Sequence, residues 1–267
     1  MSEAHLDNPA GRLWRVLLRL RQYPGSSDQK PKTVRQALCD YFGIELGDDP
    51  AYYARISAVM RLPVEIREEV NELEDPYIPV AQLVRPLAVT EHFLANYGVG
   101  RHPVHKVVSS ITDGILNDLE TCSHILSRMR EAVALSSEDL DNIRAAAQVL
   151  IDEILADTSL PAKLRGGLLR LAYQVLRTVD EYKVLGGEAV LDAWDTLAGM
   201  TGRNGSTVRK RTRIWDAIRN LGLIISTVVT IAGAPEQIGN GIEYIGELLA
   251  IEGTIEAPGG VSPDDSA

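Results

Sequence analysis

Apolar residues recur every three or four positions along most of this chain, and this spacing restricts the fold more than any other feature. It is clearest in residues 103–135, where the repeating positions are Val104, Val108, Ile111, Ile115, Leu119, Cys122, Leu126, Met129 and Val133. A period near 3.6 residues places such side chains on one face of an α-helix. Nowhere does the chain alternate apolar and polar residues over a length that would build a sheet. The sequence therefore predicts an all-α protein, a multi-helix bundle.

Capping residues and helix breakers divide this pattern into elements. Asn8 followed by Pro9 starts a first helix, and prolines delimit the short helices after it. We expect these short helices at 33–42, 50–60, 63–73 and 80–96, the last of them bent at Pro86. Gly186 and Gly187 separate the last two of the longer helices, which should lie at 103–135, 136–157, 161–185 and 188–200.

The segment GRNGS at 202–206 is the clearest linker in the chain. Two apolar faces follow it, at 214–232 and 238–249, with a turn at Ala234-Pro235 between them. The expected organisation is a subdomain of short helices at 1–100 and a bundle of long helices at 101–202. A C-terminal apolar helical hairpin at 206–252 and a disordered tail at 253–267 complete it.

Charge is distributed unevenly in this acidic protein, whose formal net charge is −10. Residues 203–219 hold one acid, Asp216, against six bases: Arg203, Arg209, Lys210, Arg211, Arg213 and Arg219. We call Arg209, Lys210, Arg211 and Arg213 the basic collar. The acidic remainder repels phosphate, so nucleic acid is not an expected partner. The collar instead predicts contact with an acidic protein, a second copy or an anionic membrane surface. The apolar contact residues would be Leu221, Ile224, Ile225, Val228 and Ile231.

Residues 220–235 carry no charge. A membrane-spanning helix needs about 20 mostly apolar residues, so we favour a buried bundle helix over insertion into the inner membrane. The N-terminal arginines could hold an anionic lipid surface or acids on the same protein. Arg15 and Arg19 interrupt the first apolar stretch, which excludes a secretory signal. The two cysteines have no metal-like spacing, and a cytoplasmic location is expected.

Motifs of familiar chemistry are absent from the sequence. It contains no phosphate-binding glycine loop, HExxH, nucleophile elbow or Cys/His zinc spacing, so we expect no cofactor and no metal. His102 and His105, with His92 upstream, match a zinc site weakly, and His102 is explained as a residue near a helix start. An acidic run is interpreted as a solvated helix face without a role: Glu65, Glu68, Glu69, Glu72, Glu74 and Asp75.

Arg85 and His92, with six residues between them on an expected helix, resemble the R-x(4–6)-H motif of HEPN ribonucleases. The resemblance implies metal-independent RNA cleavage by these two residues. The residue after the arginine is usually polar in that family and is Pro86 here. Residues 159–200 are also similar to a helical segment of uncharacterised bacterial proteins, which implies a bacterial source and a helix–corner–helix unit.

Three hypotheses follow from the sequence. The first is a non-enzymatic bacterial interaction or effector protein whose collar and apolar hairpin engage a protein partner or membrane surface. The alternative is a HEPN-like ribonuclease using Arg85 and His92. The third is a structural helical subunit of a larger assembly.

Overall fold

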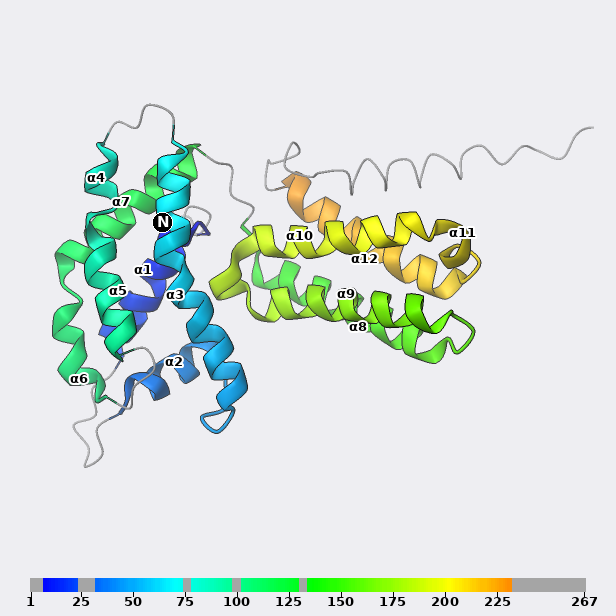
Figure 1. Cartoon of the computed structure of the whole chain (residues 1–267), viewed down its shortest axis with the longest axis horizontal. Helices are drawn as coiled ribbons and strands as arrows, with labels where there is room; N and C mark the ends of the chain where they lie inside the picture. Colours follow the sequence, from blue (N-terminus) through cyan, green and yellow to red (C-terminus); the bar gives the residue numbers. More distant parts are fainter. Residues whose placement is uncertain (1–6, 24–31, 74–77, 98–101, 130–133, 232–267) are drawn as a thin grey trace, which may run out of the picture.

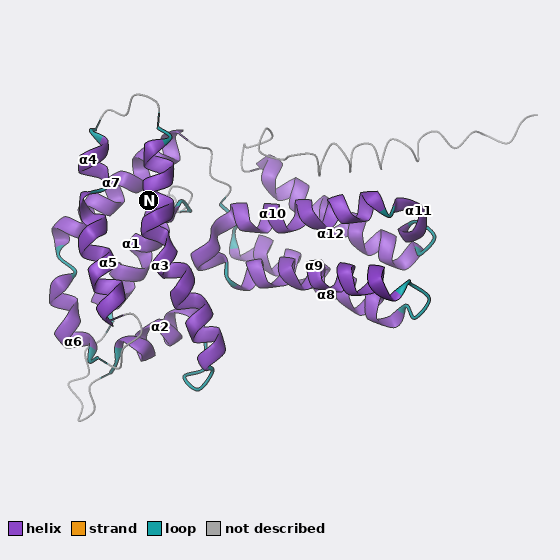
Figure 2. Ribbon diagram, viewed as in Figure 1, coloured by secondary structure: helices purple, strands orange, loops and turns teal. Residues whose placement is uncertain are grey.

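The computed structural model describes residues 7–23, 32–73, 78–97, 102–129 and 134–231, and these are almost entirely helical (Figures 1 and 2). The all-α prediction is confirmed, since the described residues contain an isolated bridge between Thr33 and Pro103 but no strand. The second arm of the expected hairpin and the expected tail lie outside the described residues. The helices are α1 (Pro9–Gln22), α2 (Val34–Phe42), α3 (Asp49–Asn71), α4 (Val80–Leu83), α5 (Arg85–Tyr97), α6 (Val104–Val107), the 3₁₀ helix η2 (Val108–Ser110), α7 (Asp113–Met129), α8 (Ser137–Ala156), α9 (Ala162–Asp180), α10 (Tyr182–Arg203), α11 (Gly205–Val208) and α12 (Thr212–Ile231).

Buried side chains form two clusters, one in each lobe of Figure 1. The first is built by α1 to α7, and Val184 of α10 joins it. The second runs from Leu135 to Val228, where α8 packs against α9 and α12, and α9 packs against α10. Apart from Val184, the residues of the first core end at Leu126 and those of the second core begin at Leu135. The boundary expected from the sequence was near residue 100.

Helix α3 replaces the two helices expected at 50–60 and 63–73. Pro63 lies inside it, where a proline removes a backbone hydrogen bond and costs about 3 kcal/mol. Burial on both sides of the proline offsets that cost, because one face of α3 is almost wholly enclosed. Its buried apolar side chains are Tyr52, Ile56, Val59, Leu62, Ile66 and Val70.

The long helix expected at 103–135 is divided into α6, η2 and α7. Its apolar positions still reach the first core from Val104 to Leu126. The break falls at Ile111, whose backbone leaves the helical region (φ −92°, ψ 84°). Thr112 then starts α7, because its hydroxyl accepts a hydrogen bond from the Ile115 N–H at 3.3 Å.

Helix α10 is kinked at Gly186. This residue adopts φ +77° and ψ −180°, so the helical conformation is interrupted there, where the sequence predicted a boundary between two helices. Only glycine adopts this conformation readily. The Asp7 carboxylate accepts a hydrogen bond from the Gly187 N–H at 3.0 Å, at the start of the straight segment that follows. The kink therefore lies where the N-terminal lobe meets the bundle.

Candidate functional site

The basic collar lies at the end of the bundle that is distant from the N-terminal lobe. Residues 204–212 turn the chain from α10 into α12 through the single turn of α11. Arg209, Lys210 and Arg213 are exposed, and the Arg209 guanidinium lies 5.4 Å from the ring centre of Trp215. The local fold thus holds three positive charges in solvent at the start of α12.

Arg211, the fourth collar residue, is tied to the bundle. Its Nη2 donates to the Ser159 carbonyl at 3.2 Å, and its Nε lies 3.6 Å from Asp157 Oδ2. Hydrogen bonds from the Ser159 hydroxyl and N–H, together with Arg211, hold the pKa of Asp157 below its usual range. Arg211 therefore stabilises the junction of α8, α9 and α12.

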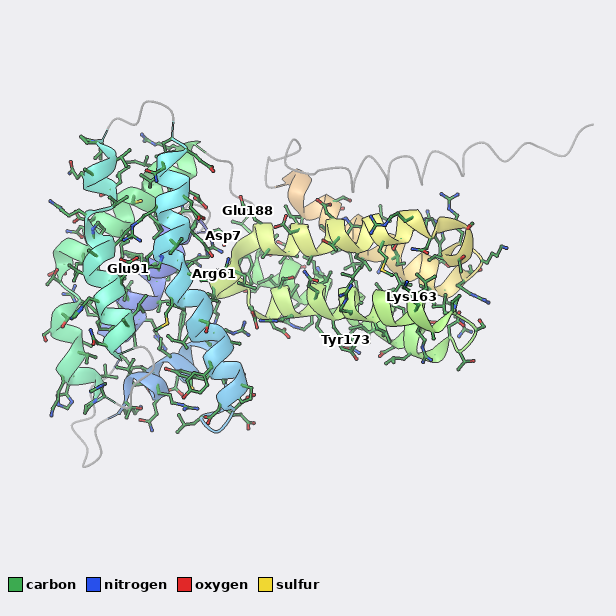
Figure 3. The ribbon with its side chains drawn as sticks, viewed as in Figure 1. Asp7, Arg61, Glu91, Lys163, Tyr173 and Glu188 are labelled. Atoms are coloured by element: carbon green, nitrogen blue, oxygen red, sulfur yellow. The ribbon has the colours of Figure 1, made fainter. Side chains whose placement is uncertain are left out.

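Two further bases share this end of the molecule. Lys163, labelled in Figure 3, lies in the first turn of α9, and Arg203 ends α10. Both residues are exposed. We call the exposed set of Lys163, Arg203, Arg209, Lys210 and Arg213 the basic tip. A hollow of about 480 Å³ beside it is lined by Glu153, Asp157, Arg211 and Arg213. Its charges are balanced, so the excess positive charge belongs to the exposed tip rather than to the hollow.

Four of the five apolar residues predicted to touch a partner are described, and these four pack within the bundle. Leu221, Ile225 and Val228 are 0%, 1% and 8% exposed and belong to the second core. Ile224 is partly buried against the same core, and the side chain of Ile231 lies outside the described residues. Among the described residues, no helix is both long and apolar enough to span a bilayer. In this structure the apolar face of α12 packs against α8. The surface that remains exposed at the basic tip is charged.

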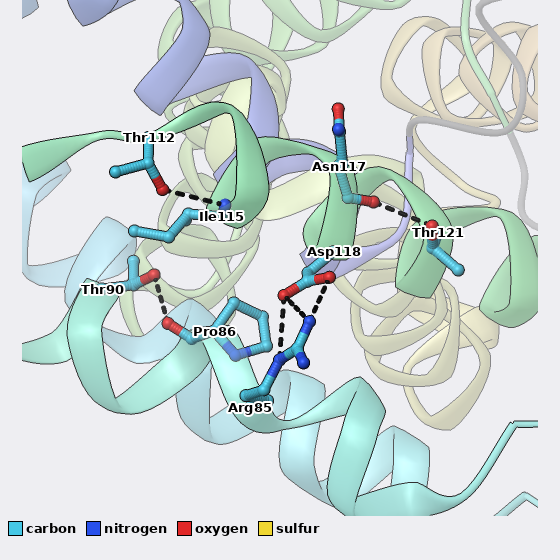
Figure 4. A network of polar contacts seen from close by, with 8 residues as sticks. All are labelled: Arg85, Pro86, Thr90, Thr112, Ile115, Asn117, Asp118 and Thr121. Carbon is cyan, nitrogen blue, oxygen red and sulfur yellow. Dashed lines mark hydrogen bonds and ion pairs between the residues drawn. The ribbon is translucent and has the colours of Figure 1, made fainter.

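Arg85 and His92 are both exposed residues of α5, and Figure 4 shows Arg85 pointing toward Asp118. The Arg85 guanidinium forms a bidentate ion pair with Asp118 of α7, with Nη2 at 2.7 and 2.8 Å from the two carboxylate oxygens. His92 lies two helical turns further along and its Nε2 is 3.1 Å from the amide nitrogen of Asn96. The structure thus gives the two residues separate partners.

The histidines and cysteines in the described part of the chain do not gather into a metal-binding cluster. No group of three or more His, Cys, Asp or Glu residues there could hold a metal ion. Cys39 and Cys122 are buried free thiols. Burial raises the pKa of both thiols, that of Cys122 to about 12, so they are protonated at neutral pH.

An acidic groove lies beside the kink of α10. It has a volume of about 390 Å³, and its walls come from α3 and α10 with Arg12 of α1. Six carboxylates line it against the two guanidinium groups of Arg12 and Arg61, a formal charge of −4: Glu65, Glu68, Glu69, Glu72, Glu188 and Asp192. The acidic run of α3 was interpreted as a solvated face without a role. The fold brings two acids of α10 to the same groove, and this cannot be read from the sequence.

A small recess of about 20 Å³ adjoins the groove and shares Arg12, Glu69, Leu185 and Glu188 with it. Asp7 lines this recess and is 7% exposed. Its Oδ1 is buried without a hydrogen-bond partner among the described residues. Burial raises the pKa of Asp7 to about 6, although the Gly187 N–H, Arg12 and Arg15 oppose the shift. Sequence reasoning missed Asp7, for which the capping signal at Asn8-Pro9 was the nearest indication.

No protein-family model matches the sequence, and comparison with curated proteins and with solved structures gives no match either. The basic tip and the acidic groove therefore stand on the geometry and charge of this chain alone.

Proposed function

We propose that this protein is a non-enzymatic interaction protein that binds an acidic protein surface through its basic tip. The observation that carries the proposal is the concentration of exposed bases at one end of an otherwise acidic molecule. Arg209 and Lys210, on the turn before α12, and Arg213, in the first turn of α12, are exposed to solvent, while the whole chain has a net charge of −10. Such a patch attracts negatively charged surfaces and repels positively charged ones.

The packing of α12 favours a protein partner over a membrane. A peripheral membrane helix needs an exposed apolar face to insert below the headgroups. Leu221, Ile225 and Val228 are enclosed by the bundle. Binding would then depend on charged contacts at the tip, which act over about 8–10 Å and weaken with added salt.

The proposal is tested by reversing the exposed collar charges in a triple variant, Arg209→Glu, Lys210→Glu and Arg213→Glu. Arg211 stays unchanged, because its contacts with Ser159 and Asp157 hold the bundle together. A fluorescent polyglutamate peptide serves as the acidic probe, and binding is followed by anisotropy. We expect the wild type to bind the peptide at low salt and the triple variant to bind it at least about tenfold more weakly.

A matched control reverses three exposed bases elsewhere, Lys106→Glu, Arg128→Glu and Arg170→Glu, with the same change in net charge. This control should keep most of the wild-type affinity. If both variants lost the same amount of affinity for polyglutamate, the loss would follow from the change in net charge and not from its position. That result would overturn the proposal. Wild-type binding to anionic vesicles without binding to polyglutamate would assign the tip to a membrane surface instead.

A further inference from the structure

The acidic groove and the basic tip have opposite charge and lie at different places on one molecule. The groove lies beside Gly186, where the lobes meet, and the tip lies beyond the other end of α10. Fifteen residues of helix separate Glu188 from Arg203, which is about 22 Å at ~1.5 Å per residue. A rigid helix of this length keeps the tip of a molecule out of its own groove.

The groove is shaped for an extended basic element. On α3, Glu65 to Glu72 span two turns, about 10 Å of helix. Glu188 and Asp192 on α10 are one turn apart, so they lie on the same face of that helix. Leu185, Ala58 and Ala189 supply apolar wall between the two acidic rows. Carboxylates around an apolar surface suit lysine and arginine side chains, whose methylene stems need apolar contact and whose heads need charge.

The recess is a second feature that favours binding of a cationic group. Asp7 is 7% exposed; its Oδ2 accepts the Gly187 N–H and Tyr182 interacts with the carboxylate, while Oδ1 has no donor within hydrogen-bond distance among the residues that the structure describes. A buried polar atom without a hydrogen bond is costly, and a volume of about 20 Å³ holds one group of the size of a water molecule. A lysine ammonium has that size and would donate to Oδ1. The basic tip carries two lysines, Lys163 and Lys210.

We propose that the acidic groove of one copy receives the basic tip of a second copy of this chain. This inference rests on the proposed function, in that it identifies the acidic partner of the tip as the chain itself. The tip carries five exposed bases and the groove a formal charge of −4, so the two surfaces come close to neutralising each other. Because the two surfaces differ, the contact is head-to-tail and leaves a tip and a groove open at the ends of each assembly.

Sedimentation velocity of the full chain tests this proposal. The wild type should form dimers and longer species as its concentration rises at low salt. Its apparent dissociation constant should increase at least about tenfold between about 50 and about 300 mM NaCl. A wild type that stays monomeric at every concentration and salt level overturns the inference.

Two charge-reversed variants make the test specific. The tip variant is the triple collar variant above. The groove variant is Glu68→Lys, Glu188→Lys and Asp192→Lys, which changes exposed carboxylates only. Each variant alone should be monomeric, because its tip and its groove then carry the same sign of charge. An equimolar mixture should associate again, since it restores opposite charges at each tip–groove contact. If the mixture stays monomeric, or if either variant alone associates like the wild type, the inference is wrong.

Three controls test whether a loss of self-association comes from the charges of the groove and tip, from misfolding, or from failure of the proposed function. Helicity by circular dichroism should match the wild type in both variants. Reversal of three carboxylates outside the groove, Glu45→Lys, Glu120→Lys and Asp152→Lys, should leave self-association unchanged, and its loss there would overturn the inference. Failure to self-associate while the tip still binds polyglutamate refutes this inference alone. Failure of the tip variant to weaken polyglutamate binding refutes the proposed function.

Discussion

Asp7 is a carboxylate from which folding removes nearly all water. Its Oδ2 accepts the Gly187 N–H, and Arg12 and Arg15 lie close enough to stabilise its charge. These contacts do not offset burial, so the pKa rises from 3.8 to about 6. The folded state thus binds the Asp7 proton more tightly than the unfolded state does. Ionisation of Asp7 therefore lowers stability.

The pH dependence of this effect follows from the sign of the shift. Below pH 4 the side chain is protonated in both states, and above pH 6 it is ionised in both. Between these values the contribution of Asp7 to the free energy of unfolding should fall by about 3 kcal/mol as pH rises. Asp7→Asn keeps an oxygen acceptor and removes the ionisation. Urea unfolding from pH 4 to 7 should show the variant gaining stability relative to wild type, and parallel curves would contradict the assignment.

Arg85 and His92 offer a residue-scale test of the ribonuclease alternative. We expect purified protein to leave single-stranded RNA intact, because Asp118 holds the Arg85 guanidinium and His92 contacts Asn96. Gel analysis after incubation with a chelator is the measurement. Metal-independent cleavage that His92→Ala abolishes would overturn this expectation. Arg85→Ala should change the free energy of unfolding by less than about 1 kcal/mol, since its side chain is 64% exposed.

Helix α10 is the element whose geometry creates the groove. A methyl group on Gly186 would lie 2.5 Å from Arg12 Nη1 and 3.3 Å from the Asp7 carbonyl oxygen. Alanine also disfavours the φ of +77°. Gly186→Ala should therefore destabilise the protein by at least about 2 kcal/mol in chemical denaturation.

Gly199, on the same helix, provides the control. A methyl group there would meet Arg203 Nη1 at an ordinary 3.8 Å. Gly199→Ala should stabilise the protein by about 0.5–1 kcal/mol through the higher helix propensity of alanine. Equal changes in stability for the two substitutions would show that the kink does not require glycine at position 186.

Element type was predictable from the sequence, because period and caps are local properties. Ser136 caps α8 with the capping-box hydrogen bonds that its spacing from Asp139 indicates. The break at Gly186 was also predicted, but its contacts with Asp7 and Arg12 were not. An error arose where distant residues decide: Pro63 continues a helix because the first core encloses it. The two halves of the acidic groove lie over 100 residues apart, so spacing alone could not reveal it.

At the scale of the whole molecule, truncating a side chain in one core should destabilise that core more than the other. Leu168 is fully buried in the second core, and Leu168→Ala should cost about 2–5 kcal/mol there. Variants that retain only Trp14 or only Trp194 report on the first and second core by fluorescence. We expect Leu168→Ala to shift the Trp194 transition more than the Trp14 transition, and Leu17→Ala to do the reverse. Equal shifts would mean that the chain unfolds as one unit.

The joint between the lobes has a consequence for protein synthesis. Asp7 bonds to a residue 180 positions later, and the side chain of Asn8 bonds to the Ser123 carbonyl 115 positions later. A ribosome adding about 5–20 residues per second exposes Gly187 roughly 10–35 s after Asp7. During that interval the nascent chain can assemble its first lobe, but the Asp7 carboxylate still lacks the Gly187 N–H. The Asp7 side chain thus reaches its final bonding only after 180 further residues have been synthesised.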